Sequence, residues 1–280
     1  MLRYGLKWAN LSCSFDTVCT ILLCLYSTFS LEQRRHLQTS WGRFGDILAS
    51  VDMRSKASVA DAKRKMMEIF IRNPLDPIFV PGVMYSIETV YQFILAKHFL
   101  KTDNEEDFMR VKYEITKECP LGCHQYSQEY KKRELDLFSS VKVRIDPDDA
   151  SVKVLLKNFW ARRNHTCNVC NSVMTPIRKF ARPPAILAVS VNGMETKIDQ
   201  ILHDQGATYS VFAVAYRGES HFNALIRLDD IVYEYDGMVK DGLFRQVGSD
   251  EYVFNNVYRD TLERDMKAQI VWYTQFTKFA

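Results

Sequence analysis

Apolar residues near the start of the chain are spaced as in an α-helix. Residues 18–25 are almost all apolar, and their distribution follows a helical rather than an alternating period. Ser12, Ser14 or Asp16 can cap the free amides where such a helix starts. The pattern therefore predicts a core helix that begins close to Cys13.

Further helices are expected on both sides of a proline-rich break. Residues 31–67 are polar and charged, with apolar residues at irregular helical spacing, and a second helix is expected over 60–71. Residues 73–82 are rich in helix stoppers, whereas residues 86–100 carry an apolar stripe with a period near 3.6. The first third of the chain is therefore expected to form a helical lobe around the Cys13 helix.

The last third of the chain has the short runs of a β-sheet. Three strand-like runs, 209–216, 221–228 and 231–235, are separated by tight turns, which is typical of an antiparallel meander. A buried strand is also expected over 185–191, and the alternating residues 269–276 can complete the sheet. The fold class is therefore α+β, with strand or helix left open for the middle runs 135–145 and 151–160.

Four cysteines in the middle of the chain form two close pairs with metal-ligand spacing. They are Cys119, Cys123, Cys167 and Cys170. Two such pairs on tight turns suit one structural zinc ion with four thiolate ligands. Reduced thiols without a metal are an alternative, and so is replacement of one thiolate by His124 or His165.

Composition limits the class of protein. The chain has 280 residues, which suffices for one large domain or two modest ones, and 47% of them are hydrophobic. A net charge of only +3 gives no reason to expect nucleic-acid binding. The seven cysteines favour a reducing compartment, so an intracellular location, nuclear or cytoplasmic, is expected. The apolar run 18–29 is too short to span a bilayer, so no membrane partner is expected.

A histidine and an aspartate stand where paired strands bring them together. His221 opens the second strand of the meander and Asp236 closes the third. Antiparallel strands joined by a tight turn place these ends side by side, so Asp236 can fix the tautomer of the imidazole. Asp229 and Asp230 fit this role less well, because they belong to the turn itself. At Cys13, the helix dipole and free backbone N–H groups favour a thiolate, which is the nucleophile that such a base would serve.

These segments resemble the cysteine and histidine boxes of ubiquitin-specific proteases. Cys13-Ser-Phe-Asp-Thr-Val, Ser-His221-Phe-Asn-Ala and Tyr233-Glu-Tyr-Asp236-Gly correspond to Thr-Cys-Tyr-Met-Asn-Ser, Gly-His-Tyr-x-Ala-Tyr and Trp-Tyr-x-Phe-Asp-Asp of the family. The opening Trp-x-Asn-x-Ser-Cys is closer still to compact SUMO-directed relatives and to cysteine-protease domains of fungal transposable elements. The family usually has its oxyanion-stabilising Asn five residues before the nucleophile, where this chain has Trp8. Asn10 is the nearest Asn, and Asn10 or Ser12 is the candidate oxyanion donor.

The resemblance implies a papain-like cysteine peptidase over residues 1–280. Its expected parts are a helical lobe with the nucleophile over 1–110, a zinc-binding fingers-like insert over 111–182 and a β-sheet lobe with His221 and Asp236 over 183–280. The implied activity is a thiol-dependent isopeptidase that cleaves after the C-terminal Gly of ubiquitin or SUMO, with neither modifier favoured. The alternatives are a zinc-stabilised, non-catalytic protein- or DNA-binding module of a mobile element, and a thiol peptidase acting on ordinary peptide bonds. The oligomeric state is left open.

Overall fold

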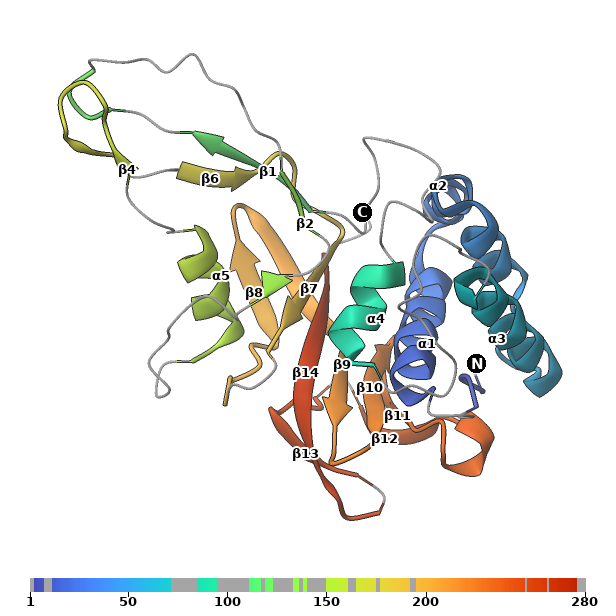
Figure 1. Cartoon of the computed structure of the whole chain (residues 1–280). Helices are drawn as coiled ribbons and strands as arrows, with labels where there is room; N and C mark the ends of the chain where they lie inside the picture. Colours follow the sequence, from blue (N-terminus) through green and yellow to red (C-terminus); the bar gives the residue numbers. More distant parts are fainter. Residues whose placement is uncertain are drawn as a thin grey trace. The chain divides into compact units, whose positions relative to one another are not determined.

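The chain divides into two compact units. One is made of Met1–Asp107 and Phe212–Val271, and the other of Phe108–Val211 and Trp272–Ala280 (Figure 1). The computed structural model describes residues 3–7, 12–71, 85–94, 111–116, 119–122, 133–135, 138–139, 150–160, 165–174, 177–191, 195–249, 251–260 and 262–275. The organisation as a single peptidase domain stays a prediction.

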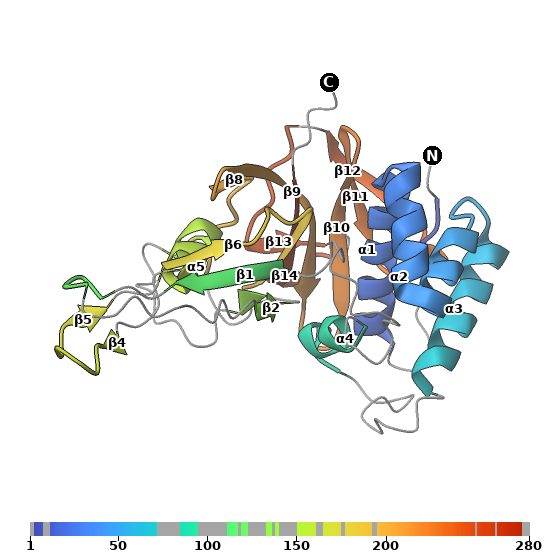
Figure 2. The ribbon, with the colours of Figure 1, turned by 90° about the horizontal axis from the view of Figure 1, so that it is seen from above.

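The helices of the first unit surround a buried central helix. They are α1 (Cys13–Thr28), α2 (Leu31–Ser50), α3 (Lys56–Ile71) and α4 (Ile87–Ile94). Every residue of α1 from Cys13 to Tyr26 is buried, including the polar Ser14, Asp16, Thr17 and Thr20. Figure 2 shows α2 and α3 on one side of α1 and strands β10 and β11 on the other. Among the helices that the structure describes, none has the length and apolar character that crossing a membrane requires.

The start of α1 agrees with the sequence, but its cap does not. Ser12 is the N-cap residue and makes no side-chain capping hydrogen bond. Its hydroxyl instead donates to Oδ2 of Asp16, 2.5 Å away, so neither side chain serves as the expected cap. At the start of α2, by contrast, Ser30 and Gln33 form a complete capping box. The hydroxyl of Ser12 is therefore used in a polar network at the start of α1.

The sheet of the first unit contains the expected meander. Its strands are β9 (Ala207–Arg217, which also enters the second unit), β10 (Phe222–Leu228), β11 (Ile231–Tyr235), β12 (Arg245–Ser249), β13 (Val257–Arg259) and β14 (Asp265–Gln275, which also enters the second unit). The strand order is β12-β11-β10-β9-β14, and β13 pairs with β14. The pairs β9·β10 and β10·β11 are antiparallel, which confirms the meander. A short 3₁₀-helix, η2 (Lys240–Gly242), follows β11.

Hydrogen bonds link α1 and the segment before it to β10 and β11. The hydroxyl of Thr17 donates to the carbonyl of Phe222, at 3.5 Å. The hydroxyl of Tyr235 donates to the carbonyl of Leu6, in the segment that precedes α1. The side chains of Thr17 and Tyr235 are both buried, so their hydroxyl groups need hydrogen-bond partners within the protein. These contacts help to hold the start of α1 against the ends of two strands.

The described part of the second unit contains several groups of paired strands and a helix. They are a sheet of β2 (Arg133–Leu135), β1 (Val111–Thr116) and β6 (Ile177–Phe180), a hairpin of β4 (His165–Thr166) and β5 (Val173–Met174), the parallel pair β3 (Phe138–Ser139) and β7 (Ile186–Ser190), strand β8 (Ile201–Asp204) on β9, and α5 (Val152–Trp160). Residues 151–160 are thus mainly helical, and the rings of Phe159 and Trp160 pack edge-on against Tyr113 of β1. The fold is therefore a mixture of helices and mainly antiparallel strands, as expected.

Candidate active site

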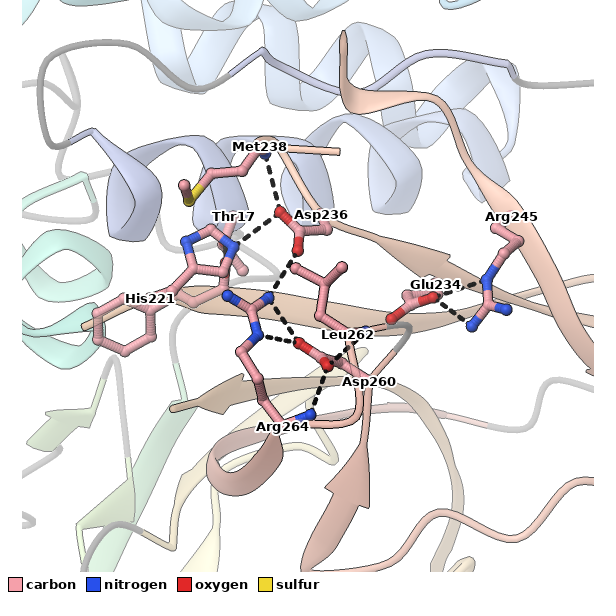
Figure 3. Close-up of polar contacts among 10 residues, drawn as sticks. Thr17, His221, Glu234, Asp236, Met238, Arg245, Asp260, Leu262 and Arg264 are labelled. Atoms are coloured by element: carbon pink, nitrogen blue, oxygen red, sulfur yellow. Dashed lines mark hydrogen bonds and ion pairs between the residues drawn. The ribbon is translucent and has the colours of Figure 1, made fainter. Parts of the chain in front are cut away.

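The hairpin of β10 and β11 brings His221 and Asp236 together. Ala224 lies opposite Tyr235, so His221, just before β10, and Asp236, just after β11, lie at the same end of the hairpin. Nε2 of His221 is 2.7 Å from Oδ1 of Asp236 (Figure 3). Both side chains are buried. Asp229 and Asp230 form the turn at the other end of the hairpin, as the sequence indicated.

Three groups contact the carboxylate of Asp236. Oδ1 accepts hydrogen bonds from Nε2 of His221 and from the backbone N–H of Met238, at 2.7 and 2.8 Å. Oδ2 accepts from Nη2 of Arg264, at 3.2 Å. Burial raises the pKa of Asp236, but the His221 hydrogen bond and charge, the Met238 amide and Arg264 together bring it below its usual value. Asp236 is therefore held as an anion whose orientation is fixed from both oxygens.

The imidazole of His221 also neighbours the nucleophile candidate, Cys13. Nδ1 is buried and has no partner of normal hydrogen-bond geometry within the described part of the chain. Burial lowers the pKa of His221, whereas the Asp236 hydrogen bond and the neighbouring Cys13 sulfur raise it, to about 9 overall. A protonated imidazole beside a thiol is the arrangement that stabilises a thiolate. Cys13, His221 and Asp236, the three residues expected from the sequence, are thus brought into one cluster.

The other two cysteines of α1 occupy a different environment. Cys19 and Cys24 are completely buried, and burial raises the pKa of both thiols. A thiol in such surroundings stays protonated and is a poor nucleophile. The environment of both residues is therefore that of apolar packing, which is the interpretation favoured by their position within the apolar run.

A buried ion pair lies one turn from Cys13. Nζ of Lys63, from α3, is 2.7 Å from Oδ1 of Asp16 and donates to the hydroxyl of Ser12 at 2.9 Å. It also donates to the carbonyl of Lys7 at 2.5 Å. Burial raises the pKa of Asp16 to about 7, despite the opposing effect of Lys63. Nothing in the local sequence distinguishes Lys63 from the solvated basic residues Arg64 and Lys65 beside it.

Of the two candidate oxyanion donors, Asn10 and Ser12, only Ser12 lies within the described residues. Asn10 and Trp8 lie outside the described residues. Ser12 is described, and its hydroxyl proton is directed to Asp16. A hydroxyl has one proton to donate, so Ser12 has none left for an oxyanion in this arrangement.

The ion pair of Arg264 and Asp260, which the sequence did not indicate, lies next to Asp236. Arg264 contacts Asp236 and, through Nε and Nη2, Oδ2 of Asp260, at 2.6 Å in both cases. Asp260 follows β13 and Arg264 precedes β14. The signal in the sequence is weak, because an Asp and an Arg four residues apart are common in exposed loops.

The three described cysteines of the second unit form a cluster. The sulfur atoms of Cys119, Cys167 and Cys170 all lie within 4.8 Å of one another. Two thiolates on one tetrahedral zinc ion are about 3.8 Å apart, given Zn–S bonds of about 2.3 Å, so this donor set fits a zinc ion. Cys123, the fourth expected ligand, lies outside the described residues. The hydroxyl of Ser172 is 3.3 Å from the sulfur of Cys119 and 2.8 Å from that of Cys170.

Comparison with known proteins gives a match in structure but not in sequence. No protein-family model matches the chain, and no curated protein matches it significantly. Among solved structures, the SAGA DUB module of Ubp8, Sgf11, Sus1 and Sgf73 bound to monoubiquitin matches with a TM-score of 0.65 and 11% identity, covering 98% of this chain and 69% of the other. The same module bound to ubiquitin aldehyde gives a TM-score of 0.63 and 13% identity, covering 98% and 70%. A yeast SAGA DUB module gives 0.59 and 13%, covering 98% and 68%.

At this level of identity the likeness is one of fold. It extends over nearly the whole chain, and it agrees with the mixture of helices and antiparallel strands described above. The chain therefore shares the fold of these DUB modules, which agrees with the resemblance of its cysteine and histidine boxes to ubiquitin-specific proteases.

Proposed function

We propose that this chain is a thiol-dependent isopeptidase that removes a ubiquitin-type modifier from lysine by cleavage after the modifier's C-terminal Gly. The observation that carries the proposal is the His221–Asp236 pair, at 2.7 Å, beside Cys13 at the start of a buried helix. Support also comes from the fold, since the similar DUB modules are described as bound to monoubiquitin or ubiquitin aldehyde. The rival function, a non-catalytic binding module, gives no reason for a buried His–Asp pair next to a thiol.

Each of the three residues has one role in the proposed reaction. The thiolate of Cys13 attacks the carbonyl carbon of the terminal Gly and forms a thioester as the C–N bond breaks. His221, protonated at Nδ1, gives its proton to the leaving lysine amine. It then takes a proton from water, which attacks the thioester and releases the modifier as a carboxylate. Asp236 keeps Nε2 protonated and stabilises the imidazolium.

We assign the stabilisation of the oxyanion to two donors, the backbone N–H of Cys13 and the side-chain amide of Asn10. Acyl transfer requires donors that point to where the tetrahedral oxygen forms. The first residue of a helix has a backbone N–H without an intrahelical partner, so Cys13 supplies one donor. The Ser12 hydroxyl is engaged with Asp16, which leaves Asn10 as the side chain for this role.

We also propose a structural zinc ion held by Cys119, Cys123, Cys167 and Cys170. Its support is the spacing of the three described sulfur atoms and the tight turns that carry them. A zinc ion there would stabilise the two turns by joining them, and it would take no part in the reaction. Both the zinc thiolates and the nucleophile require reduced sulfur, so we place the protein inside the cell, in the nucleus or cytoplasm.

The choice of modifier is tested by comparing two substrates. Ubiquitin and SUMO, each carrying a fluorogenic amide at the C-terminal Gly, are incubated with the wild-type chain and with Cys13→Ala. The proposal expects release of the fluorophore from at least one substrate by the wild type and from neither by the variant. Binding of a modifier without hydrolysis of either substrate would favour the non-catalytic module instead. Hydrolysis of an unrelated peptide amide at a similar rate would favour an ordinary thiol peptidase.

A further inference from the structure

The loop between β13 and β14 brings a guanidinium to the carboxylate of Asp236. Nη2 of Arg264 is 3.2 Å from Oδ2 of Asp236, on the oxygen that His221 does not use. Figure 3 shows this guanidinium between the carboxylates of Asp236 and Asp260. The side chain of Arg264 is 34% exposed, whereas those of Asp236 and Asp260 are 4% and 0% exposed. A line of alternating charges therefore runs from His221 to Asp260.

Asp260 also fixes the backbone of this loop. Its Oδ1 accepts hydrogen bonds from the backbone N–H groups of Leu262 and Arg264, both at 2.9 Å. Its own N–H donates to the carbonyl of Arg264, at 3.1 Å, and its carbonyl accepts from the N–H of Glu263, at 3.0 Å. One residue thus sets both the backbone position and, through Nε and Nη2, the side-chain direction of Arg264. Such a double constraint is more than a surface ion pair provides.

We propose that Arg264 and Asp260 are positioning residues, which hold the carboxylate of Asp236 in the orientation that directs Oδ1 to Nε2 of His221. A carboxylate bonded through both oxygens cannot rotate without losing a contact, so the imidazole has a fixed partner. Asp260 balances the charge of Arg264, so that the cation does not weaken the imidazolium. The catalytic meaning of this pair rests on the function proposed above, whereas its effect on Asp236 and His221 does not.

The charged groups around His221 determine in which direction the loss of Arg264 shifts the pH dependence. Asp236 and Arg264 lie on its Nε2 side, and Cys13 and Asp16 of α1 act on it from the other element. Loss of Arg264 leaves Asp236 and Asp260 buried without their shared cation, so the pKa of Asp236 rises. A protonated Asp236 no longer supports the imidazolium, and the thiolate of Cys13 loses its partner. The acidic limb of any Cys13-dependent rate should therefore move to higher pH.

The test compares Arg264→Met with Arg259→Met in the full chain. Arg259 is its matched control, because it lies in the same hairpin, is 68% exposed and pairs with Asp265, which is 66% exposed. Two rates are measured across pH: alkylation of Cys13 by iodoacetamide, followed by mass spectrometry, and hydrolysis of the modifier substrate. Arg264→Met should lower kcat about tenfold with KM within about twofold, and should raise the midpoint of the acidic limb of both profiles by about one unit. Arg259→Met should leave both profiles unchanged.

Arg264→Lys keeps the inference testable if Arg264→Met does not fold. Lysine keeps the charge but lacks the planar fork that reaches both carboxylates at once. The acidic limb should then stay at its wild-type position while kcat falls several-fold. Folded Arg264 variants with wild-type kcat and wild-type pH profiles would overturn the inference. If the wild type hydrolyses no modifier, the alkylation profile still decides the role of Arg264, so failure of the proposed function is recognised separately.

Discussion

Nε2 of His221 lies 2.7 Å from Oδ1 of Asp236, although the complete hairpin of β10 and β11 separates the two residues in the chain. The pairing register alone brings them to the same end of that hairpin. The backbone N–H of Met238 and the guanidinium of Arg264 then fix the carboxylate. The orientation of the proposed base is thus a consequence of sheet register, reinforced from the loop before β14.

Asp236→Asn should lower turnover by orders of magnitude with little change in modifier binding. A neutral amide favours the wrong tautomer of His221 and does not stabilise the imidazolium. Asp230→Asn is the matched control, because it makes the same chemical change in the turn at the other end of the hairpin. Steady-state hydrolysis and direct binding measure the two effects. A loss below about fivefold for Asp236→Asn, or a larger loss for Asp230→Asn, would contradict the triad assignment.

The parts of the site that depend only on residues close together in the sequence could be predicted. The apolar run after Cys13 predicted α1, and the two tight turns predicted the meander and thereby the meeting of His221 with Asp236. Both predictions depend only on periodicity and on the geometry of hairpins. They needed no information about contacts between distant elements.

The partners that come from distant elements could not be predicted in this way. Lys63 reaches Asp16 from α3, and Arg264 reaches Asp236 from the loop before β14. Charged residues of this kind lie on solvated faces in most proteins, and only tertiary packing decides which of them becomes buried. The run at 151–160 shows the same limit, because a short apolar run suits a strand as well as the observed helix α5.

Lys63→Met should destabilise the protein by about 3 kcal/mol, because it leaves Asp16 buried without its cation. The loss should grow as pH rises through about 7, the raised pKa of Asp16 in the wild type, because an ionised Asp16 is stabilised by Lys63 and the variant lacks that cation. Lys65→Met is the matched control on the same helix, and loss of its exposed pair with Asp61 should change stability far less. Urea denaturation measures both. Equal losses of stability in the two variants would show that the Asp16–Lys63 pair stabilises the fold no more than an exposed ion pair does.

Stability should fall as pH rises from 6.5 to about 9, because the pKa of His221 is raised in the folded state. Between these values the folded chain binds more protons than the unfolded chain, so removing protons favours unfolding. The contribution is complete below the ordinary value of 6.5 and is lost as pH passes about 9. His221→Gln removes it, so the difference in melting temperature between wild type and variant should shrink over this interval. Parallel curves across the interval would show that the pKa of His221 is not raised.

The purified protein should contain about one zinc ion per chain, and its removal should lower the melting temperature. Cys167→Ser should lose the metal and unfold at a lower temperature, because a thiolate zinc site contributes directly to the free energy of folding. Cys24→Ala, which removes a buried thiol far along α1, should keep the metal. Elemental analysis and thermal unfolding are the measurements. Absence of zinc together with reactive thiols at Cys119 and Cys170 in the native protein would rule out the site.

The most direct test of the central claim is the intact mass of the protein after reaction with ubiquitin propargylamide or SUMO propargylamide. These probes react with a thiol that attacks the end of the modifier. We predict one adduct on the wild type, mapped to Cys13, and none on a Cys13→Ala variant that keeps its fold, whereas Cys19→Ala should react as the wild type does. No adduct with either probe, or an adduct that persists in Cys13→Ala, would contradict the account.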